Sequence, residues 1–341
     1  MHRFLDEIGR HGNAYMSDED EVGFLGALRD HAASLFRTDT RQIAILSSAS
    51  ELLGQLPFML PLAGAQVLVV ATDFPAITRP WLRLSERGGC SLGFVNDNPT
   101  SDLTTDLIEQ VNERTSLVAV SSVQYATGSV IDVPRLSAAT AAAGASLVID
   151  ATQGAGATET DTRAWGADVV VSSGYKWLGG HGGVAIGALS PSILDQTPPL
   201  PGWMGAPDPF DFSATQMLFA SDARRYTQST MSYVSVVGLA TAIDQLLTTR
   251  VEKIEHHAAR LSQLLVAAVE PHGWRPFRQL DDVAAASHII SLERQGDGLT
   301  RTLDRLRDVR IVCGNRAGRL RVSLAPYNDD DDIAALVEAL V

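Results

Sequence analysis

The stretch "ADVVVSSGYKWLGGHGG" (residues 167–183) carries one lysine, Lys176, in a glycine-rich loop that follows a run of mostly apolar residues. The run predicts a buried strand, so Lys176 follows the strand's carboxyl end. Lysine is seldom fully buried unless it is paired or reacting. Two interpretations are therefore open: Lys176 is a reactive amine, or it is a cation that holds a phosphate in a glycine loop.

Further apolar runs lie on both sides of this stretch, at residues 42–48, 65–72, 90–95, 115–123, 145–150 and 182–189. Runs that are apolar almost throughout are typical of strands buried on both faces of a sheet. Segments with helical spacing separate most of them. This alternation predicts an α/β fold with a mostly parallel seven-stranded sheet covered by helices.

The pattern changes in the last part of the chain. Residues 231–270 have the spacing of one or two long amphipathic helices, and short strand-like and helix-like segments follow them. We expect an N-terminal arm and helix over residues 1–40, a large domain over residues 41–249 and a small C-terminal α+β domain over residues 250–341.

Composition narrows the class of protein. The net charge of −13 on 341 residues argues against a broad nucleic-acid surface. No apolar run approaches the ~18 residues of a membrane span, and the first residues lack the apolar core of a secretory signal. Cys90 and Cys313 form no cluster with each other or with histidine. We therefore expect no membrane association, no metal site, no disulfide framework and a cytoplasmic location.

Asp150 also follows a predicted strand, at the end of "SLVID" (146–150). The carboxyl ends of parallel strands meet at one edge of a sheet, where ligands bind. Asp150 and Lys176 can therefore reach one crevice. Taken alone, the two residues could equally form a simple ion pair.

Two more features favour a cofactor. Ser48, Ala49 and Ser50 begin a predicted helix, whose free N–H groups and dipole suit a phosphate, although Ser50 could serve only as the helix cap. Phe74 follows another strand, and its ring could cover a flat cofactor or belong to the core. A phosphate cradle, a ring, a carboxylate and an amine together fit pyridoxal phosphate.

The motifs resemble those of the class V aminotransferase branch of fold-type-I pyridoxal-phosphate enzymes. That group includes cysteine desulfurases, kynureninases, isopenicillin-N-epimerase-like proteins and carbon–sulfur lyases, and the likeness runs from about residue 40 to the end. "IDATQ" (149–153) is similar to the family's Asp-x-x-Gln, which implies Asp150 on the ring nitrogen and Gln153 on the phenolic oxygen. "SSGYKWLGG" (172–180) is similar to Ser-x-(His/Tyr)-Lys, which implies Lys176 as the Schiff-base lysine, with Ser173 and Tyr175 on the phosphate.

Further site residues are implied by the same resemblance. "FPAITRPW" (74–81) implies Phe74 as the ring that stacks on the cofactor, and "SVQYATG" (122–128) puts Gln124 and Tyr125 near the cofactor or substrate. "RLRVSLAPYN" (319–328) implies that Arg321 binds the substrate's α-carboxylate, which matches the planar fork of a guanidinium. Thr230 is implied to reach the phosphate of a neighbouring subunit, which would make the active unit a homodimer.

The sequence departs from the family at two positions. Desulfurases with a reactive cysteine before the C-terminal arginine carry it on a longer loop, whereas Cys313 ends an apparent strand. We expect Cys313 to be a small buried hydrophobe, with a desulfurase that uses it as an alternative. His181 stands where many relatives have proline, and it is either a proton donor or acceptor on the substrate side or an ordinary loop residue.

These residues predict an enzyme that acts on an amino acid through an external aldimine and an α-carbanion, with Lys176 taking the α-proton. Side-chain cleavage at a C–S or similar β bond is favoured, and transamination and epimerisation are alternatives. A nucleotide-binding protein is disfavoured because Gly154 and Gly156 do not open an apolar helix. An inactive binding module would have no need of Lys176, Asp150 and Arg321 together.

Overall fold

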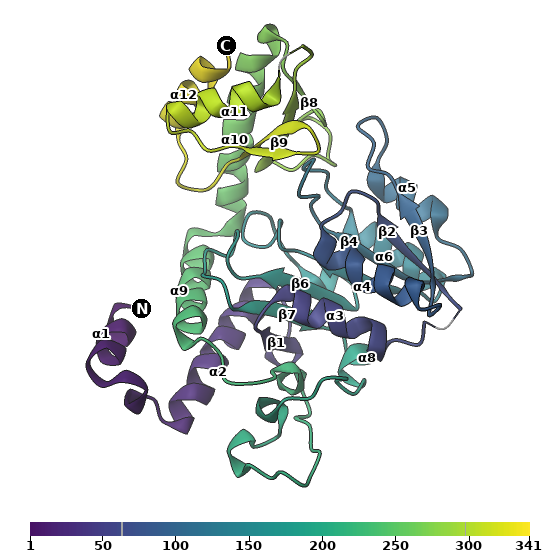
Figure 1. The fold of residues 1–341 in the computed structure, drawn as a ribbon, viewed down its shortest axis with the longest axis vertical. Coiled ribbons are helices and arrows are strands. Elements are labelled where there is room, and N and C mark those ends of the chain that lie inside the picture. Colours follow the sequence, from purple (N-terminus) through teal and green to yellow (C-terminus); the bar gives the residue numbers. More distant parts are fainter. Residues whose placement is uncertain (63, 297) are drawn as a thin grey trace.

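The computed structural model describes residues 1–62, 64–296 and 298–341. A seven-stranded sheet forms the centre of the larger lobe, in the order β1-β7-β6-β5-β4-β2-β3 (Figure 1). The strands are β1 (Ile43–Leu46), β2 (Gln66–Val70), β3 (Ser91–Val95), β4 (Thr115–Ser121), β5 (Ser146–Asp150), β6 (Val169–Ser173) and β7 (Ala185–Leu189). Strands β3, β2, β4, β5 and β6 pair in parallel, and β7 runs antiparallel to β6 and β1. The predicted mostly parallel sheet is confirmed.

Helices cover both faces of this sheet, which explains why its strands are apolar almost throughout. Ala44, Leu46 and Val67 belong to one hydrophobic cluster, together with buried residues of α3 (Ala49–Met59) and α4 (Pro75–Glu86). Their chain neighbours Ile43, Ile45 and Leu68 belong to the other, with α2 (Asp18–Leu35), α5 (Leu103–Gln110), α6 (Val133–Ala142) and α9 (Tyr233–Thr249). Successive strand residues therefore point into opposite cores.

The N-terminal forty residues hold two α-helices, α1 (His2–His11) and α2. Leu25 and Leu28 of α2 are buried in the same core as α9, so α2 is part of the larger lobe's packing. Beyond β7 the chain makes a long excursion with only short elements, among them α8 (Pro191–Leu194), before α9 begins at Tyr233. This excursion forms the lowest part of the molecule in Figure 1. The short helix α7 (Thr162–Trp165) precedes β6.

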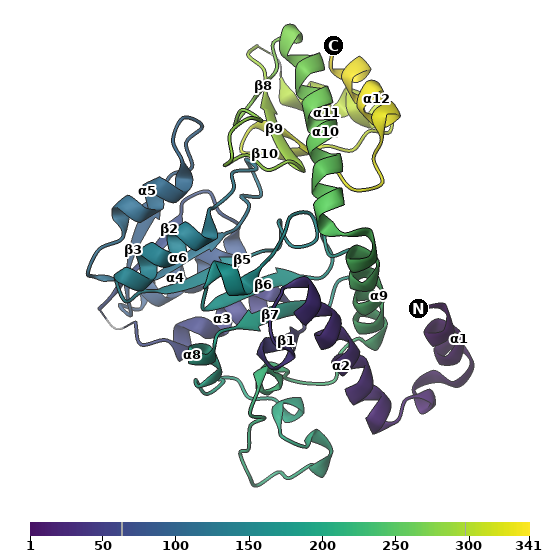
Figure 2. The same ribbon diagram turned by 180° about the vertical axis from the view of Figure 1, so that it is seen from behind.

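The smaller lobe lies above the larger one and is joined to it by α10 (Val251–Val269) (Figure 2). Arg250, between α9 and α10, has φ of 73°, so the chain turns there. An antiparallel sheet of order β10-β11-β9-β8 packs with α10 and two further helices. These elements are β8 (Arg275–Pro276), β9 (Ile289–Glu293), α11 (Leu299–Asp308), β10 (Gly314–Arg316), β11 (Arg319–Ser323) and α12 (Asp330–Leu340).

The carboxyl ends of β1, β2, β4, β5 and β6 meet at one edge of the large sheet, because all five run in the same direction. The loop between the antiparallel neighbours β6 and β7 carries Lys176 at this edge. Within the described residues, no helix is long and apolar enough to cross a membrane.

Candidate active site

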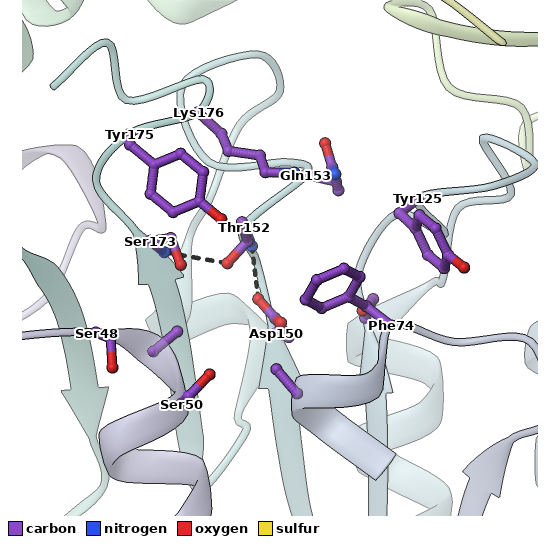
Figure 3. Close-up of a pocket in the computed structure, with 13 residues that line it drawn as sticks. Ser48, Ser50, Phe74, Tyr125, Asp150, Thr152, Gln153, Ser173, Tyr175 and Lys176 are labelled. Carbon is purple, nitrogen blue, oxygen red and sulfur yellow. Dashed lines mark hydrogen bonds between the residues drawn. The ribbon is translucent and has the colours of Figure 1, made fainter. Parts of the chain in front are cut away.

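A cavity of about 110 Å³ opens at this edge of the sheet (Figure 3). Each of the segments that follow β1, β2, β4, β5 and β6 contributes to its wall, which brings together most of the residues that the sequence singled out. The lining residues are Ser48, Ala49, Ser50, Phe74, Ala76, Ser121, Tyr125, Asp150, Thr152, Gln153, Ser173, Tyr175 and Lys176.

Lys176 extends its amine between two aromatic rings. Its Nζ lies 5.9 Å from the centroid of the Phe74 ring and 5.7 Å from that of Tyr175. Burial lowers the pKa of Lys176, and the positive charge of Arg321 lowers it further, against the opposing charge of Asp150. A lowered pKa leaves more of the amine unprotonated near neutral pH, which is the form that acts as nucleophile or base. The chain's only other lysine, Lys253, is exposed on α10.

Asp150 is buried at the end of β5, with its carboxyl group directed into the cavity (Figure 3). Burial raises the pKa of Asp150 to about 6, and the charge of Asp73 adds to this, while hydrogen bonds from Thr152 oppose it. The backbone N–H of Thr152 donates to Asp150 Oδ1 at 2.9 Å, and Thr152 Oγ1 accepts from the N–H of Ser173 at 3.0 Å. Thr152, which the sequence analysis missed, thereby ties the ends of β5 and β6 together.

Small hydroxyl residues and a helix N-terminus form one end of the cavity. Ser48 caps α3 by accepting a hydrogen bond from the N–H of Glu51 at 3.2 Å. The interpretation of Ser50 as the helix cap is therefore wrong, and Ser50 lines the cavity as a residue of the first helical turn. Ser173 and Tyr175 lie above the two serines in Figure 3. Helix N–H groups with hydroxyls beside them favour a phosphate.

Phe74 and Tyr125 form the aromatic side of the cavity. Their ring centroids are 5.4 Å apart and the planes meet at 79°. Phe74 is 40% exposed, so its ring is not part of the core and offers a face that a ligand can cover.

A buried carboxylate, which the sequence analysis also missed, lies next to Phe74. Asp73 accepts hydrogen bonds from the N–H of Phe74 at 2.7 Å, from the N–H and Oγ of Ser121 at 2.8 and 2.6 Å, and from Gln124 Nε2 at 3.0 Å. Burial raises the pKa of Asp73 above its usual value, although each of these donors lowers it. The network fixes the backbone that presents Phe74.

Four predicted residues do not line this cavity: Gln124, His181, Thr230 and Arg321, which lines the neighbouring cleft instead. Gln124 is buried and its amide donates to Asp73, so it supports the wall through Asp73, and its expected place near the cofactor or substrate stays a prediction. His181 is exposed in the loop before β7, and its proposed proton-transfer role stays a prediction. Thr230 is exposed and does not line the cavity of its own chain.

Gln153 is held in one amide orientation. Trp177 Nε1, which can only donate, lies 3.0 Å from Gln153 Oε1. His288 Nε2 donates to the Gln153 carbonyl at 2.6 Å, and burial lowers the pKa of His288 to about 4, so this ring is neutral at pH 7. With its oxygen engaged, Gln153 offers its NH₂ group as a donor to a ligand. His288, the residue before β9 of the smaller lobe, was not predicted from the sequence.

Arg321 reaches the site from β11 of the smaller lobe. Its Nη1 donates to the carbonyl of Tyr125 at 2.9 Å, while its Nε is buried without a hydrogen-bond partner. Burial lowers the pKa of Arg321, as does the charge of Arg316. An unpartnered buried donor on a cationic group suits an anionic acceptor that a ligand would bring.

Cys313 is half-buried against the small lobe's core and is not among the lining residues of the cavity. Burial raises the pKa of the Cys313 thiol to about 11, so the thiol is protonated at neutral pH. A protonated thiol is a poor nucleophile.

The donor set fits pyridoxal phosphate. The hydroxyls and helix N-terminus would hold its phosphate, the Phe74 ring its flat face and the Gln153 amide its phenolic oxygen. The buried carboxyl of Asp150 would face the ring nitrogen and Lys176 the aldehyde carbon.

Comparisons with known proteins agree with this fit. The family model described as aminotransferase class-V matches residues 24–336. An uncharacterised aminotransferase, YcbU of Bacillus subtilis (strain 168), is 24% identical over 317 residues, which is 92% of this chain and 82% of the relative. A probable cysteine desulfurase of Aeropyrum pernix is 28% identical over 299 residues, which is 82% of this chain and 72% of the relative.

Solved structures show the same fold. The cystine C–S lyase C-DES, in complex with cysteine persulfide, matches with a TM-score of 0.89 at 19% identity, covering 99% of this chain and 92% of that one. The match to an apo cysteine desulfurase of Thermococcus onnurineus NA1 has a TM-score of 0.86 at 20% identity, covering 94% and 84%. The protein belongs to the aminotransferase class-V family, whose fold-type-I enzymes depend on pyridoxal phosphate.

Proposed function

We propose that this protein uses pyridoxal phosphate to cleave the side chain of an amino acid at a C–S or similar β bond. The observation that carries the proposal is that Lys176, the only lysine besides the exposed Lys253, lines one cavity with Asp150 and Phe74. Relatives described as probable cysteine desulfurases and the fold neighbour described as a cystine C–S lyase support this reaction class.

In this proposal Ser48, Ser50 and Ser173 hold the phosphate, and Asp150 pairs with the ring nitrogen. When bound, the cofactor withdraws electrons from the α-carbon of the substrate. Because the pKa of Asp150 is about 6, its carboxylate is ionised at neutral pH and favours a protonated ring nitrogen opposite it.

The chain's own groups then position the substrate and move its proton. Arg321 binds the α-carboxylate through its free Nε, which fixes the α-carbon beside Lys176. Lys176 Nζ takes the α-proton, and its lowered pKa favours the unprotonated form of the amine that can do so. The electron pair of the broken C–H bond then expels the β-substituent with its bonding electrons, and hydrolysis of the remaining three-carbon unit gives pyruvate and ammonia.

Transamination and epimerisation use the same proton transfer and stay as alternatives. A desulfurase that depends on Cys313 is a further alternative, which the raised pKa of that thiol disfavours.

The chain's small number of lysines makes a sharp test of the cofactor. Protein supplied with pyridoxal phosphate is expected to turn yellow, and borohydride should fix the cofactor to the peptide that contains Lys176 and not to that of Lys253. Lys176→Ala should abolish the absorption band, and Lys253→Ala is the matched control that should keep it. A colourless protein, or label on Lys253, would contradict the proposal.

Products then identify the reaction. S-substituted cysteines should give pyruvate and ammonia in equal amounts. Accumulation of the pyridoxamine form would establish transamination instead, and loss of substrate chirality without either product would establish epimerisation.

The finer proposals are a cytoplasmic location and a homodimer in which Thr230 reaches the partner's phosphate. Cys90 and Cys313 are both free, which supports a reducing compartment. The excursion that leads to Thr230 exposes apolar side chains, with Phe212 69%, Met217 68% and Leu218 56% exposed, which supports contact with a second copy.

A hybrid experiment tests the dimer. Lys176→Ala and Thr230→Ala chains, each weak alone, should regain activity when mixed, because one site of each hybrid then carries both residues. Mixtures no more active than their components would overturn the crossing of Thr230.

A further inference from the structure

A wide cleft adjoins the cavity on the side of the smaller lobe. Its volume is about 610 Å³, and it lies between the loop after Lys176, the junction of α9 with α10, and the segment that follows β11. Much of its wall is apolar and is formed by Trp177, Leu178, Ala242, Leu246, Ile254 and Pro326.

The cleft is continuous with the candidate active site. Gln153, Tyr175 and Lys176 line both spaces, and Arg321, whose buried Nε has no hydrogen-bond partner, lines the cleft. An amino acid whose carboxylate binds Arg321 and whose α-carbon lies beside Lys176 therefore has the cleft open to its side chain.

The charges of the wall restrict what that side chain can be. Among the described residues that line the cleft, the charged ones are Lys176 and Arg321, which are both positive; the polar remainder, such as Gln245 and Tyr327, is neutral. A side chain with its own ammonium group would find no carboxylate here, and desolvating an unpaired charge is costly.

The volume of the cleft restricts the substrate side chain further. Benzene fills an apolar cavity of about 150 Å³ in another protein, and this cleft offers about 610 Å³. The thiol of cysteine would leave most of that space unfilled. We propose that the cleft is the side-chain subsite and that the substrate is a cysteine S-conjugate with a bulky, uncharged alkyl or aryl group. This inference rests on the proposed function, since it takes Arg321 and Lys176 as the groups that hold the substrate.

Unreactive analogues test the subsite without turnover. 3-(Benzylsulfanyl)propanoate and 3-sulfanylpropanoate lack the α-amino group, so titration calorimetry of the loaded and cofactor-free protein measures binding alone. Covering the ring's apolar surface in an open cleft should make the benzyl compound bind at least about 10-fold more tightly. Equal affinities, or tighter binding of the small thiol, would overturn the proposal.

Two substitutions on α9 place the binding in this cleft. Ala242→Phe should place a ring in the apolar part of the cleft and reduce the preference for the benzyl compound. Gln245→Glu adds a carboxylate at an exposed lining position and should improve binding of 3-(2-aminoethylsulfanyl)propanoate by about 2- to 5-fold. Thr248→Glu, an exposed α9 position outside the lining, is the control and should have little effect. Equal gains in both glutamate variants would contradict the assignment.

The outcomes distinguish a failure of the side-chain subsite proposal from a failure of the proposed function. Pyruvate formation from S-substituted cysteines without a benzyl preference would refute the subsite and leave the reaction standing. A benzyl preference in a protein that never attaches the cofactor at Lys176 would support the subsite and refute the reaction.

Discussion

Replacing Asp150 with asparagine should stabilise the cofactor-free protein against unfolding. The same substitution should weaken the binding of pyridoxal phosphate. The buried carboxyl of Asp150 has a pKa raised to about 6, whereas in the unfolded chain it lies near its ordinary value. Folding therefore becomes less favourable as pH rises between about 4 and 6, because the unfolded chain releases this proton first. The free-energy cost of burying the ionised Asp150 carboxylate is fully present above about pH 6 and nearly absent below about pH 4.

The size of the effect follows from the pKa difference. About two pKa units correspond to ~3 kcal/mol at pH 7.5. Asparagine keeps an oxygen that can accept from the N–H of Thr152, but its NH₂ group needs new partners in a buried place. We therefore expect Asp150→Asn to raise the free energy of unfolding by about 1–3 kcal/mol at pH 7.5.

Urea titration followed by tryptophan fluorescence measures this difference for the cofactor-free protein. At pH 4 the carboxyl is protonated in the folded state and about half protonated in the unfolded chain, so the gain of the variant should shrink to well under about 1 kcal/mol, which provides an internal control. A variant that is destabilised equally at both pH values would refute the assignment of Asp150 as a costly buried carboxylate.

The same substitution should have the opposite effect on the loaded protein. Without a carboxylate opposite the ring nitrogen, pyridoxal phosphate should bind about 30-fold or more weakly. Unchanged affinity would show that Asp150 does not face the cofactor ring.

Three further substitutions test other parts of the site. Asp73→Asn should lower the free energy of unfolding, measured by urea titration, by about 1–3 kcal/mol, because the asparagine NH₂ group would face the N–H donors of Phe74 and Ser121. An unchanged urea midpoint would show that this hydrogen-bond network adds nothing to stability. Cys313→Ser should keep pyruvate formation within about 3-fold, since that thiol is protonated and outside the cavity; a loss beyond about 10-fold would restore the desulfurase alternative. His181→Ala should change kcat by less than about 3-fold, and a shifted pH profile would instead assign it a proton transfer.

The sequence alone determined the large sheet. Each predicted run contains one observed strand, because strands covered on both faces are apolar at most positions and therefore form recognisable runs. The residues at the strand ends were also predictable, since parallel strands bring their carboxyl ends to one edge. For that reason Ser48, Phe74, Asp150 and Lys176 could be assigned to one cavity from the sequence alone.

Only the tertiary structure decided which side chains face that cavity and which support it. Gln124 follows the same strand as Tyr125, yet one turns to Asp73 and the other to the cavity, and nothing in their order along the chain separates them. Arg321 meets the Tyr125 carbonyl, and His288 meets that of Gln153, across the two lobes. Hydrophobic periodicity reports how deeply a segment is buried, whereas contacts between distant segments depend on how the lobes pack, so the cleft beside Lys176 appears only in the folded molecule.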